Sequence, residues 1–298
     1  MLTQQTVTSE EKLRRRLSTI SNLPSPPLVF TQITKVINDP RTSVKDVAAI
    51  MSEDAAMSAK VLRLSNSAFY GARNEINGIR QAILVLGLEA VKSLVLSSSV
   101  FEMFKSQKLD TDFQEAFWRH SLATALAGRM LIKQQRSLSC YDPEVAFSAG
   151  LLHDIGKLII CCFMPADHKQ VRQQLQGQGL ADYQAEEHVL GYPHTLIGRM
   201  LAQNWKLPTC IQEAIEFHHS PVDPGNEDDK YSCVIHVADY LARLTFEKKL
   251  PPSEGWSYLQ RKIRDFLGLT TELTDALSHR LLEEYSCSST FIQMALSA

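Results

Sequence analysis

His153 and Asp154 stand side by side, directly after an apolar run and two residues before Gly156. The apolar residues predict the end of a buried helix, and the glycine predicts that the helix breaks or bends there. Two ionisable neighbours are costly to bury unless a partner compensates them. A divalent metal ion is such a partner, because neutral imidazole and carboxylate are natural ligands. One such pair is a weak signal, so the rest of the chain must supply the other ligands.

The same chemistry recurs at four other places, each within a segment expected to be helical. They are His120, His194, the pair His218 and His219, and Asp239. His120 shares the three- and four-residue spacing of its apolar neighbours, which places it on an inward helix face. Each place also has a plain structural interpretation: a hydrogen-bonded core histidine, a polar helix end, or a capping or ion-paired aspartate. Metal binding is favoured because five of the nine histidines occupy such positions, and each would otherwise need its own partner in one core.

The order of these residues (His, His-Asp, His, His-His, Asp) resembles the HD superfamily of metal-dependent phosphohydrolases. Four further motifs narrow the resemblance to the HDOD family, bacterial signalling relatives of the HD-GYP phosphodiesterases. These motifs are Leu23-Pro24-Ser25-Pro26-Pro27, the run Ser-Asn-Ser-Ala-Phe-Tyr at 65–70, the run at 82–87 and Trp205-Lys206-Leu207-Pro208. The resemblance covers about residues 13 to 245 and implies an all-α, two-lobe helical HDOD fold that contains an HD-type metal pocket.

The resemblance also implies which residues would hold metal ions. One ion would be bound by His120, His153, Asp154 and Asp239. A second ion would be bound by His194, His218 and His219, with Asp154 as the bridging ligand. Because magnesium prefers oxygen ligands, such histidine-rich sets suit a divalent transition metal: iron first, then manganese, nickel or zinc.

Two more residues are expected beside the metals. Lys157 matches the lysine of the family's HD-x-GK motif, which faces substrate phosphate in relatives, so Asp154 and Lys157 are the candidate catalytic residues. Judged from the residue alone, a surface lysine that caps the C-terminus of a helix is the favoured interpretation of Lys157. His236 lies three residues before Asp239 on the same expected helix. It is predicted to line the pocket and to form a hydrogen bond there, without binding a metal.

The chain differs both from typical HDOD domains and from HD-GYP domains. HDOD domains often lack the HD ligands and are usually regulators, whereas this chain keeps every ligand type. An HD-GYP domain continues from its His-His pair into an Asp-Gly-x-Gly-Tyr-Pro loop, but here His219 is followed by Ser220-Pro221-Val222-Asp223-Pro224, which suggests a short rigid turn. The tripeptide Gly191-Tyr192-Pro193 is interpreted as a turn between helices. Ala116 stands where some HD-GYP proteins have a glutamate, so a third metal is not expected.

Two hypotheses for the function follow. In the first, the chain is a regulatory module that binds metal, together with a nucleotide or another phosphate-bearing ligand, and acts on a signalling protein that the sequence does not identify. In the second, the two metals activate a water for phosphoester hydrolysis. The resemblance favours the first hypothesis, and the retained ligands favour the second.

Composition predicts a globular cytoplasmic protein. The chain has 298 residues, of which 44% are hydrophobic and 21% charged, and a net charge of -2. Nucleic acid is therefore not expected as a partner, because the chain has no basic excess. The six cysteines show no paired metal-type spacing and are expected to be reduced and mostly buried. No membrane contact is expected, because no apolar stretch approaches the length of a membrane span and the first residues lack a secretory pattern.

Helical periodicity runs through the whole chain, and no strand is predicted. We expect a polar lead-in at 1–12, an N-terminal helical lobe at 13–108, a metal-binding lobe at 109–247 and C-terminal helices at 248–298. Residues 79–94 resemble two helices joined at Gly87, which could suggest a DNA-reading helix-turn-helix. Two core helices are favoured, because Glu89 and the apolar run after Gly87 leave few exposed groups that could read bases.

Overall fold

The computed structural model describes residues 8–20, 23, 25, 28–37, 41, 43–105, 107, 110–178, 180–221, 230–247 and 259–296. Within these ranges the chain is helical and has no strand, as the sequence predicted. The helices are α1 (Ser9–Ser18), α2 (Leu28–Ile37), α3 (Val44–Ser52), α4 (Ala55–Ser65), α5 (Ile79–Leu86), α6 (Leu88–Phe104), α7 (Thr111–Gln134), α8 (Pro143–Leu152), α9 (Ile155–Phe163), α10 (Pro165–Gln178), α11 (Asp182–Leu190), α12 (His194–Asn204), α13 (Thr209–Phe217), α14 (Lys230–Phe246), α15 (Arg261–Phe266), α16 (Thr271–Ser286) and α17 (Ser289–Leu296), with a short 3-10 turn, η1, at Arg136–Leu138.

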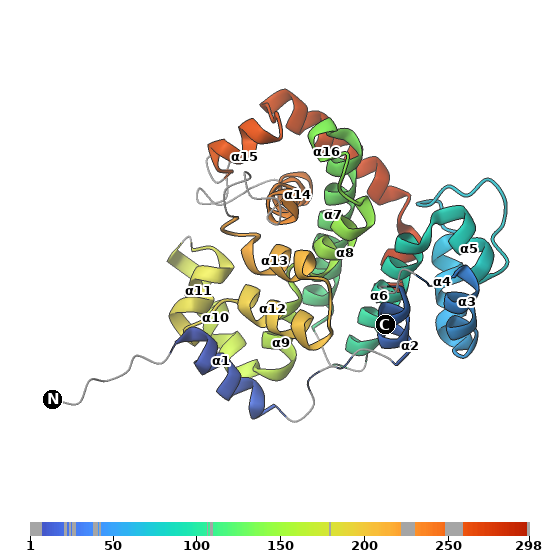
Figure 1. Ribbon diagram of the computed structural model, residues 1–298. Helices are drawn as coiled ribbons and strands as arrows, with labels where there is room; N and C mark the ends of the chain where they lie inside the picture. Colours follow the sequence, from blue (N-terminus) through green and yellow to red (C-terminus); the bar gives the residue numbers. More distant parts are fainter. Residues whose placement is uncertain are drawn as a thin grey trace.

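The helices form two groups that share α6 (Figure 1). Helices α2 to α5 make the smaller group, and α7 to α14 make the larger group. Helix α6 packs against α4 on one side and α8 on the other. Twelve of its 17 residues are buried, so it lacks the exposed face that a base-reading helix requires. The core-helix interpretation of this region therefore holds.

The two groups are joined into one hydrophobic core. A continuous cluster of buried apolar side chains runs from Leu13 in α1 to Ala295 in α17. Helix α17 contacts α7 in the larger group and also α4 and α6. Helix α1 lies beside α10 (Figure 1), where Arg16 pairs with Asp167 at 2.7 Å. The predicted boundaries at 12, 108 and 247 remain predictions, and residues 108, 109 and 248–258 lie outside the described residues.

The side chain of Asn66 holds the loop between α4 and α5 in its conformation. This loop contains the last residues of the Ser-Asn-Ser-Ala-Phe-Tyr motif. Asn66, the residue that ends α4, accepts a hydrogen bond from the backbone N–H of Ile76 at 2.7 Å and donates one to the carbonyl of Ile76 at 2.8 Å. Because the Asn66 side chain satisfies both polar groups of Ile76, the loop is closed without regular structure.

The segment that carries the His-Asp pair breaks earlier than predicted. Helix α8 ends at Leu152 and α9 begins at Ile155, so the break lies at His153 and Asp154 themselves. Gly156 lies inside α9, where an added Cβ would come within 2.0 Å of the His194 carbonyl oxygen. The glycine is therefore required for the close approach of α9 to α12, and the prediction that it breaks the helix is wrong.

Two other expectations need correction. The segment Pro143–Phe163 is long and apolar enough to cross a membrane by length and composition, contrary to the sequence expectation. Because 78% of this segment's most apolar part is buried, its hydropathy is explained by packing inside the helical core. Among the cysteines, only Cys233 is buried; Cys161, Cys162 and Cys210 are partly buried, and Cys140 and Cys287 are exposed. All six are free thiols, as expected.

Candidate metal centre

The seven predicted metal ligands meet at one place in the larger group of helices. They come from the middle of α7 (His120), the break between α8 and α9 (His153, Asp154), the start of α12 (His194), the residues after α13 (His218, His219) and the middle of α14 (Asp239). Helices α7, α8 and α14 pack on one another, and α12 packs on both α9 and α13. These contacts bring together residues that are up to 119 positions apart in the sequence.

Four residues form the first cluster. The Nε2 atom of His120 lies 3.2 Å from Nε2 of His153 and 3.0 Å from Oδ1 of Asp239. The Oδ2 atom of Asp154 lies 3.6 Å from Nε2 of His120 and 3.4 Å from Nε2 of His153. His153, Asp154 and Asp239 are buried, while the His120 side chain is 15% exposed. Imidazole nitrogens and carboxylate oxygens thus face a common point that is reached from the His120 side.

The second cluster contains Asp154 and three histidines. Oδ1 of Asp154 lies 3.0 Å from Nε2 of His194 and 3.6 Å from Nε2 of His218. Nε2 of His219 lies 3.3 Å from Nε2 of His194. One ligand atom from each of these four residues falls within 4.8 Å of the others, a spacing that could hold a metal ion. Asp154 therefore stands between the clusters, with Oδ2 toward the first and Oδ1 toward the second.

His153 and His218 are oriented by hydrogen bonds of Nδ1, the ring nitrogen that points away from the clusters. Nδ1 of His153 lies 2.7 Å from the Gly150 carbonyl, and Nδ1 of His218 lies 2.8 Å from the Ile215 carbonyl. A carbonyl only accepts, so each Nδ1 must carry the proton, and in the neutral ring the Nε2 lone pair points into the cluster. Within the described residues, the buried Nε2 of His218 has no hydrogen-bond partner. A buried nitrogen in this state is costly, and a metal ion would satisfy it.

The pKa values of three of these side chains favour the protonation states that metal binding requires. Burial lowers the pKa of His218 to about 3 and, with His218 alongside, lowers the pKa of His219 well below its usual range. Both rings are therefore neutral. Burial alone would raise the pKa of the Asp154 carboxyl, but His153 and Lys157 hold that pKa well below its usual range. A metal needs neutral imidazole and ionised carboxylate, so these donors fit the predicted ions.

Asp239 has a partner that the sequence analysis missed. Arg243, one helical turn later on α14, donates from Nε to Oδ1 of Asp239 at 2.9 Å. Burial alone would raise the pKa of Asp239, but Arg243 and His120 hold it well below its usual range. The spacing of four residues between an aspartate and an arginine on one helix was the available signal.

Glu186 is a second residue that the sequence analysis missed. This buried carboxylate of α11 accepts two hydrogen bonds at 2.6 Å, one from the backbone N–H of His194 and one from its Nδ1. Burial alone would lower the pKa of His194, but Glu186 raises it to about 9. An ion bound at Nε2 would therefore displace a proton. No sequence pattern pairs Glu186 with His194 specifically; only the turn between α11 and α12 brings them together.

Lys157 lies inside the site and is no surface cap. Its Nζ is 2.8 Å from Oδ2 of Asp154 and 2.9 Å from Oδ2 of Asp182 on α11. Burial alone would lower its pKa, but these two carboxylates raise it above the usual value. The same lysine lowers the pKa of Asp182 to about 2. Lys157 is therefore a charged ammonium held between two carboxylates.

His236 is buried one turn from Asp239, and its Nδ1 lies 2.6 Å from the carbonyl oxygen of His218. This contact fixes the backbone at the His-His pair. The turn expected at Gly191-Tyr192-Pro193 joins α11 to α12, with Gly191 in the left-handed region at φ 81°. After Pro221, the proposed short turn through Pro224 lies outside the described residues.

A cavity of about 270 Å³ opens over the first cluster. His120, Lys157 and Arg243 line its polar side, together with the carboxylates of Asp154, Asp182 and Glu247. Phe113 and Phe117 of α7, with Ala116 between them, form part of its apolar wall. The site can therefore admit a small molecule whose charged end faces the candidate metal ligands.

Comparison with known proteins identifies the class to which this fold and site belong. The model of the HDOD domain family matches residues 23–221, and the chain is a member of that family. An HDOD domain protein of unknown function from Geobacter sulfurreducens has a similar solved structure, with a TM-score of 0.78 and 26% identity; the match covers 95% of this chain and 98% of that one.

A second solved structure, from Shewanella amazonensis SB2B, belongs to a protein provisionally assigned as a phosphohydrolase. It has a TM-score of 0.72 and 27% identity, and the match covers 94% of this chain and 97% of that one. An uncharacterized protein of Treponema pallidum (strain Nichols) is 24% identical over 201 residues, which are 67% of this chain and 38% of that protein. The chain thus spans well under half the length of this curated relative.

Proposed function

We propose that this chain is a regulatory module of signal transduction in which two divalent transition-metal ions and a small phosphate-bearing ligand bind together. The observation that supports this most is the position of Asp154, whose two oxygens face two different groups of histidines. A carboxylate in this position suits a bridge between two ions. Iron is the favoured metal, with manganese, nickel or zinc as alternatives, because most of the donors are imidazole nitrogens.

The proposed ligand sets use every donor of the two clusters. The first ion takes His120, His153, Asp154 and Asp239. The second takes His194, His218, His219 and the other oxygen of Asp154. His236 and Glu186 do not bind metal in this proposal; they orient the ligands through the His218 carbonyl and the His194 ring.

The cavity over the first cluster supports a phosphate-bearing ligand. Lys157 and Arg243 bring two positive charges to its polar side, beside His120. Lys157 is held by Asp154 and Asp182, and Arg243 is held by Asp239, so both cations are fixed in position before a ligand arrives. Fixed cations beside metal ions are a good match for a phosphate group, which brings several negative charges.

The packing around the site supports a regulatory role. Helix α8 ends at the His-Asp pair and packs against α6, which in turn packs against α2, α4 and α5. Ser93 of α6 donates a hydrogen bond to the carbonyl of Glu144 in α8 at 3.0 Å, and its oxygen lies 2.8 Å from that of Ser148. A change at Asp154 can therefore reach the smaller group of helices through one intervening helix, and we propose that a protein partner senses it there.

Phosphodiester hydrolysis is the second candidate function, because the cavity reaches the cluster directly. When bound, two metal ions would supply an activated water and neutralise charge on a phosphate. The chain would contribute Lys157 to hold the phosphate and Asp154 to hold both ions. A substrate as large as a cyclic dinucleotide exceeds what a cavity of about 270 Å³ encloses, so we expect weak turnover of small activated diesters at most.

The experiment combines binding and turnover on metal-reconstituted protein. Inorganic phosphate is titrated by calorimetry, and bis-p-nitrophenyl phosphate, cyclic mononucleotides and cyclic dinucleotides are offered as substrates, with D154A as the variant and H188A as the matched control. His188 is an exposed histidine of α11 outside both clusters. The regulatory proposal expects metal-dependent phosphate binding that D154A loses and H188A keeps, with little turnover.

Two results would change this conclusion. Rapid, metal-dependent cleavage of a cyclic dinucleotide that disappears in D154A would make the chain an enzyme and overturn the regulatory proposal. Phosphate binding that is unaffected by removal of metal would contradict the proposed ligand site.

A further inference from the structure

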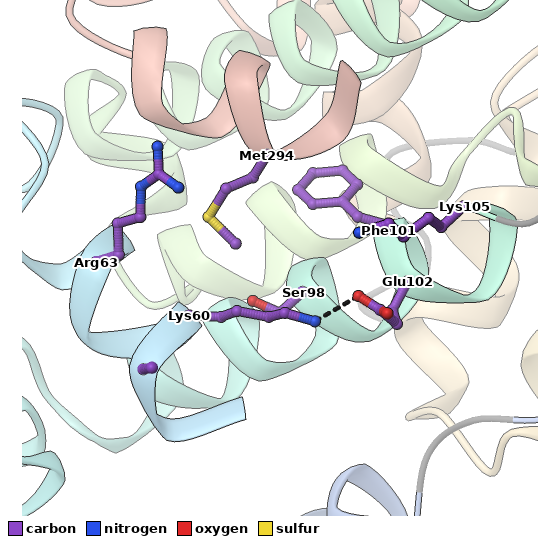
Figure 2. A pocket seen from close by; sticks show the side chains of 8 residues that line it. Lys60, Arg63, Ser98, Phe101, Glu102, Lys105 and Met294 are labelled. Carbon is purple, nitrogen blue, oxygen red and sulfur yellow. Dashed lines mark hydrogen bonds and ion pairs between the residues drawn. The ribbon is translucent and has the colours of Figure 1, made fainter. Parts of the chain in front are cut away.

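A second cavity, of about 310 Å³, lies where α4, α6 and α17 meet. It shares no lining residue with the cavity over the metal centre. Figure 2 shows the side chains that line it: Lys60 and Arg63 lie on α4, Ser98 and Glu102 on α6, and Met294 on α17. We call this space the α4–α6–α17 cavity. Its walls combine two helices from the N-terminal part of the chain, α4 and α6, with α17 near the C-terminal end.

The α4–α6–α17 cavity has an excess of positive charge. Among the residues that the structure describes, Lys60, Arg63 and Lys105 line it, against the single carboxylate of Glu102. Lys60 is paired with Glu102 (Figure 2), so the charges of Arg63 and Lys105 are not offset within the lining. Arg63 donates a hydrogen bond to the neutral amide oxygen of Gln293 at 3.3 Å. A local excess of two positive charges in a chain with a net charge of -2 favours an anion at this place.

A buried hydroxyl on this wall lacks a partner. Ser98 is 1% exposed, and its Oγ forms no hydrogen bond with any residue that the structure describes. Its neighbour Ser97 behaves as helical serines commonly do, since its hydroxyl donates to the carbonyl of Ser93 one turn earlier at 2.7 Å. A buried hydroxyl without a partner is unfavourable, and an acceptor oxygen supplied by a ligand would remove that cost.

Apolar groups complete the lining. The buried ring of Phe101 and the flexible side chain of Met294 face the cavity together with Ala59. Such a mixture, apolar walls with a few convergent polar groups, is typical of small-molecule sites. Methionine also adapts its shape to a ligand at little cost.

We propose that the α4–α6–α17 cavity binds a small organic anion. Its apolar body lies between Phe101 and Met294, and its carboxylate, sulfonate or phosphate head lies near Arg63 and Lys105. One oxygen of the ligand accepts a hydrogen bond from Ser98. The bound anion joins α17 to α4 and α6, which ties the C-terminal helices to the smaller group of helices.

The test uses naphthalene-2-sulfonate as the probe and the full chain labelled with methyl-13C methionine. Met294 reports from the cavity itself, and M294L assigns its NMR signal among those of the eight methionines. Addition of the probe is expected to shift the Met294 methyl signal saturably. R63Q is expected to weaken binding about tenfold, as for loss of a charge-assisted hydrogen bond, and S98A severalfold. K45Q, which removes an exposed lysine of α3, is the matched control and should bind like the parent chain.

A variant that binds the probe more tightly distinguishes this proposal from a general loss of structure. E102Q removes the only carboxylate of the lining and releases Lys60, so it should bind the probe more tightly than the parent chain. The proposal is overturned if the Met294 signal does not move at millimolar probe, if uncharged naphthalene-2-carboxamide binds equally well, or if E102Q weakens binding. Equal effects of R63Q and K45Q would also overturn it.

Discussion

Glycines are used differently in the two groups of helices. In the larger group, added Cβ atoms at Gly150, Gly156 and Gly198 would come within 2.7, 2.0 and 2.7 Å of neighbouring helices. In the smaller group, a Cβ at Gly78 or Gly87 would meet nothing within 4 Å. Real Cβ contacts are essentially not found below about 3 Å. Gly150 and Gly156 face backbone atoms and have no room for another residue, whereas at Gly198 the side chain of Ile215 would have to shift.

The different use of glycine reflects which side chains each group of helices must hold in place. Gly150 lets α8 approach Ala125 of α7, and Gly156 lets α9 approach the start of α12, where His194 stands. These contacts set the distances among the candidate metal ligands, which must be held to fractions of an ångström. In the smaller group the glycines only begin helices or turn the chain: Gly78 is the N-cap of α5, and Gly87 has φ 94° between α5 and α6. The tight backbone contacts therefore lie in the group of helices that holds the candidate metal ligands.

The largest effect is expected at Gly156. G156A places a methyl group against the His194 carbonyl, which is backbone and cannot move aside like a flexible side chain. We expect the free energy of unfolding to fall by about 3 kcal/mol or more, as in severe overpacking. Thermal unfolding with G78A as the matched glycine control measures the difference. Equal, small effects of the two substitutions would contradict the comparison.

An intermediate effect is expected at Glu186, which orients His194 by two hydrogen bonds. E186Q keeps the size of the side chain but weakens these charge-assisted bonds. We expect about 10- to 100-fold weaker binding of the second metal ion, with the first ion retained. Competition with a chelator measures the affinity, and E187Q, an exposed neighbour on α11, serves as control. If E186Q and E187Q bind both ions equally well, Glu186 does not position the site.

The smallest effect is expected at Gly78, where the backbone is extended (φ −163°, ψ 154°) and space is open. Serine is a better N-cap than glycine because its hydroxyl can accept a hydrogen bond from the first turn of α5. G78S should raise the free energy of unfolding by up to about 0.5 kcal/mol. Chemical denaturation measures this change, and a loss of more than that amount would show that the glycine is needed for packing after all.

Helical periodicity made most of the fold predictable. The periodicity predicts helices at about 111–135 and 88–105, and the structure has α7 at Thr111–Gln134 and α6 at Leu88–Phe104. Gly156 was misjudged because a glycine in an apolar run has two explanations, a helix break and a close helix contact. Only the position of α12, which lies far along the chain, decides between them.

The candidate site was predictable by residue type but not by its supporting contacts. His194 and His218 were found because few roles suit so many inward histidines in one chain. Glu186 was missed because an acidic residue in a polar helix usually faces solvent, and its burial depends on how α11 turns into α12. Lys157 lines the cavity over the first cluster, but its second partner, Asp182, could not be inferred because the two residues lie on different helices.

The central claim is that Asp154 holds two metal ions, and elemental analysis of the purified, metal-reconstituted chain tests it most directly. The parent chain and H188A should each carry about two transition-metal ions, and H194A about one. D154A should carry almost none, because both clusters lose the carboxylate that faces them. A parent chain without metal, or a D154A variant that keeps its full metal content, would contradict the account.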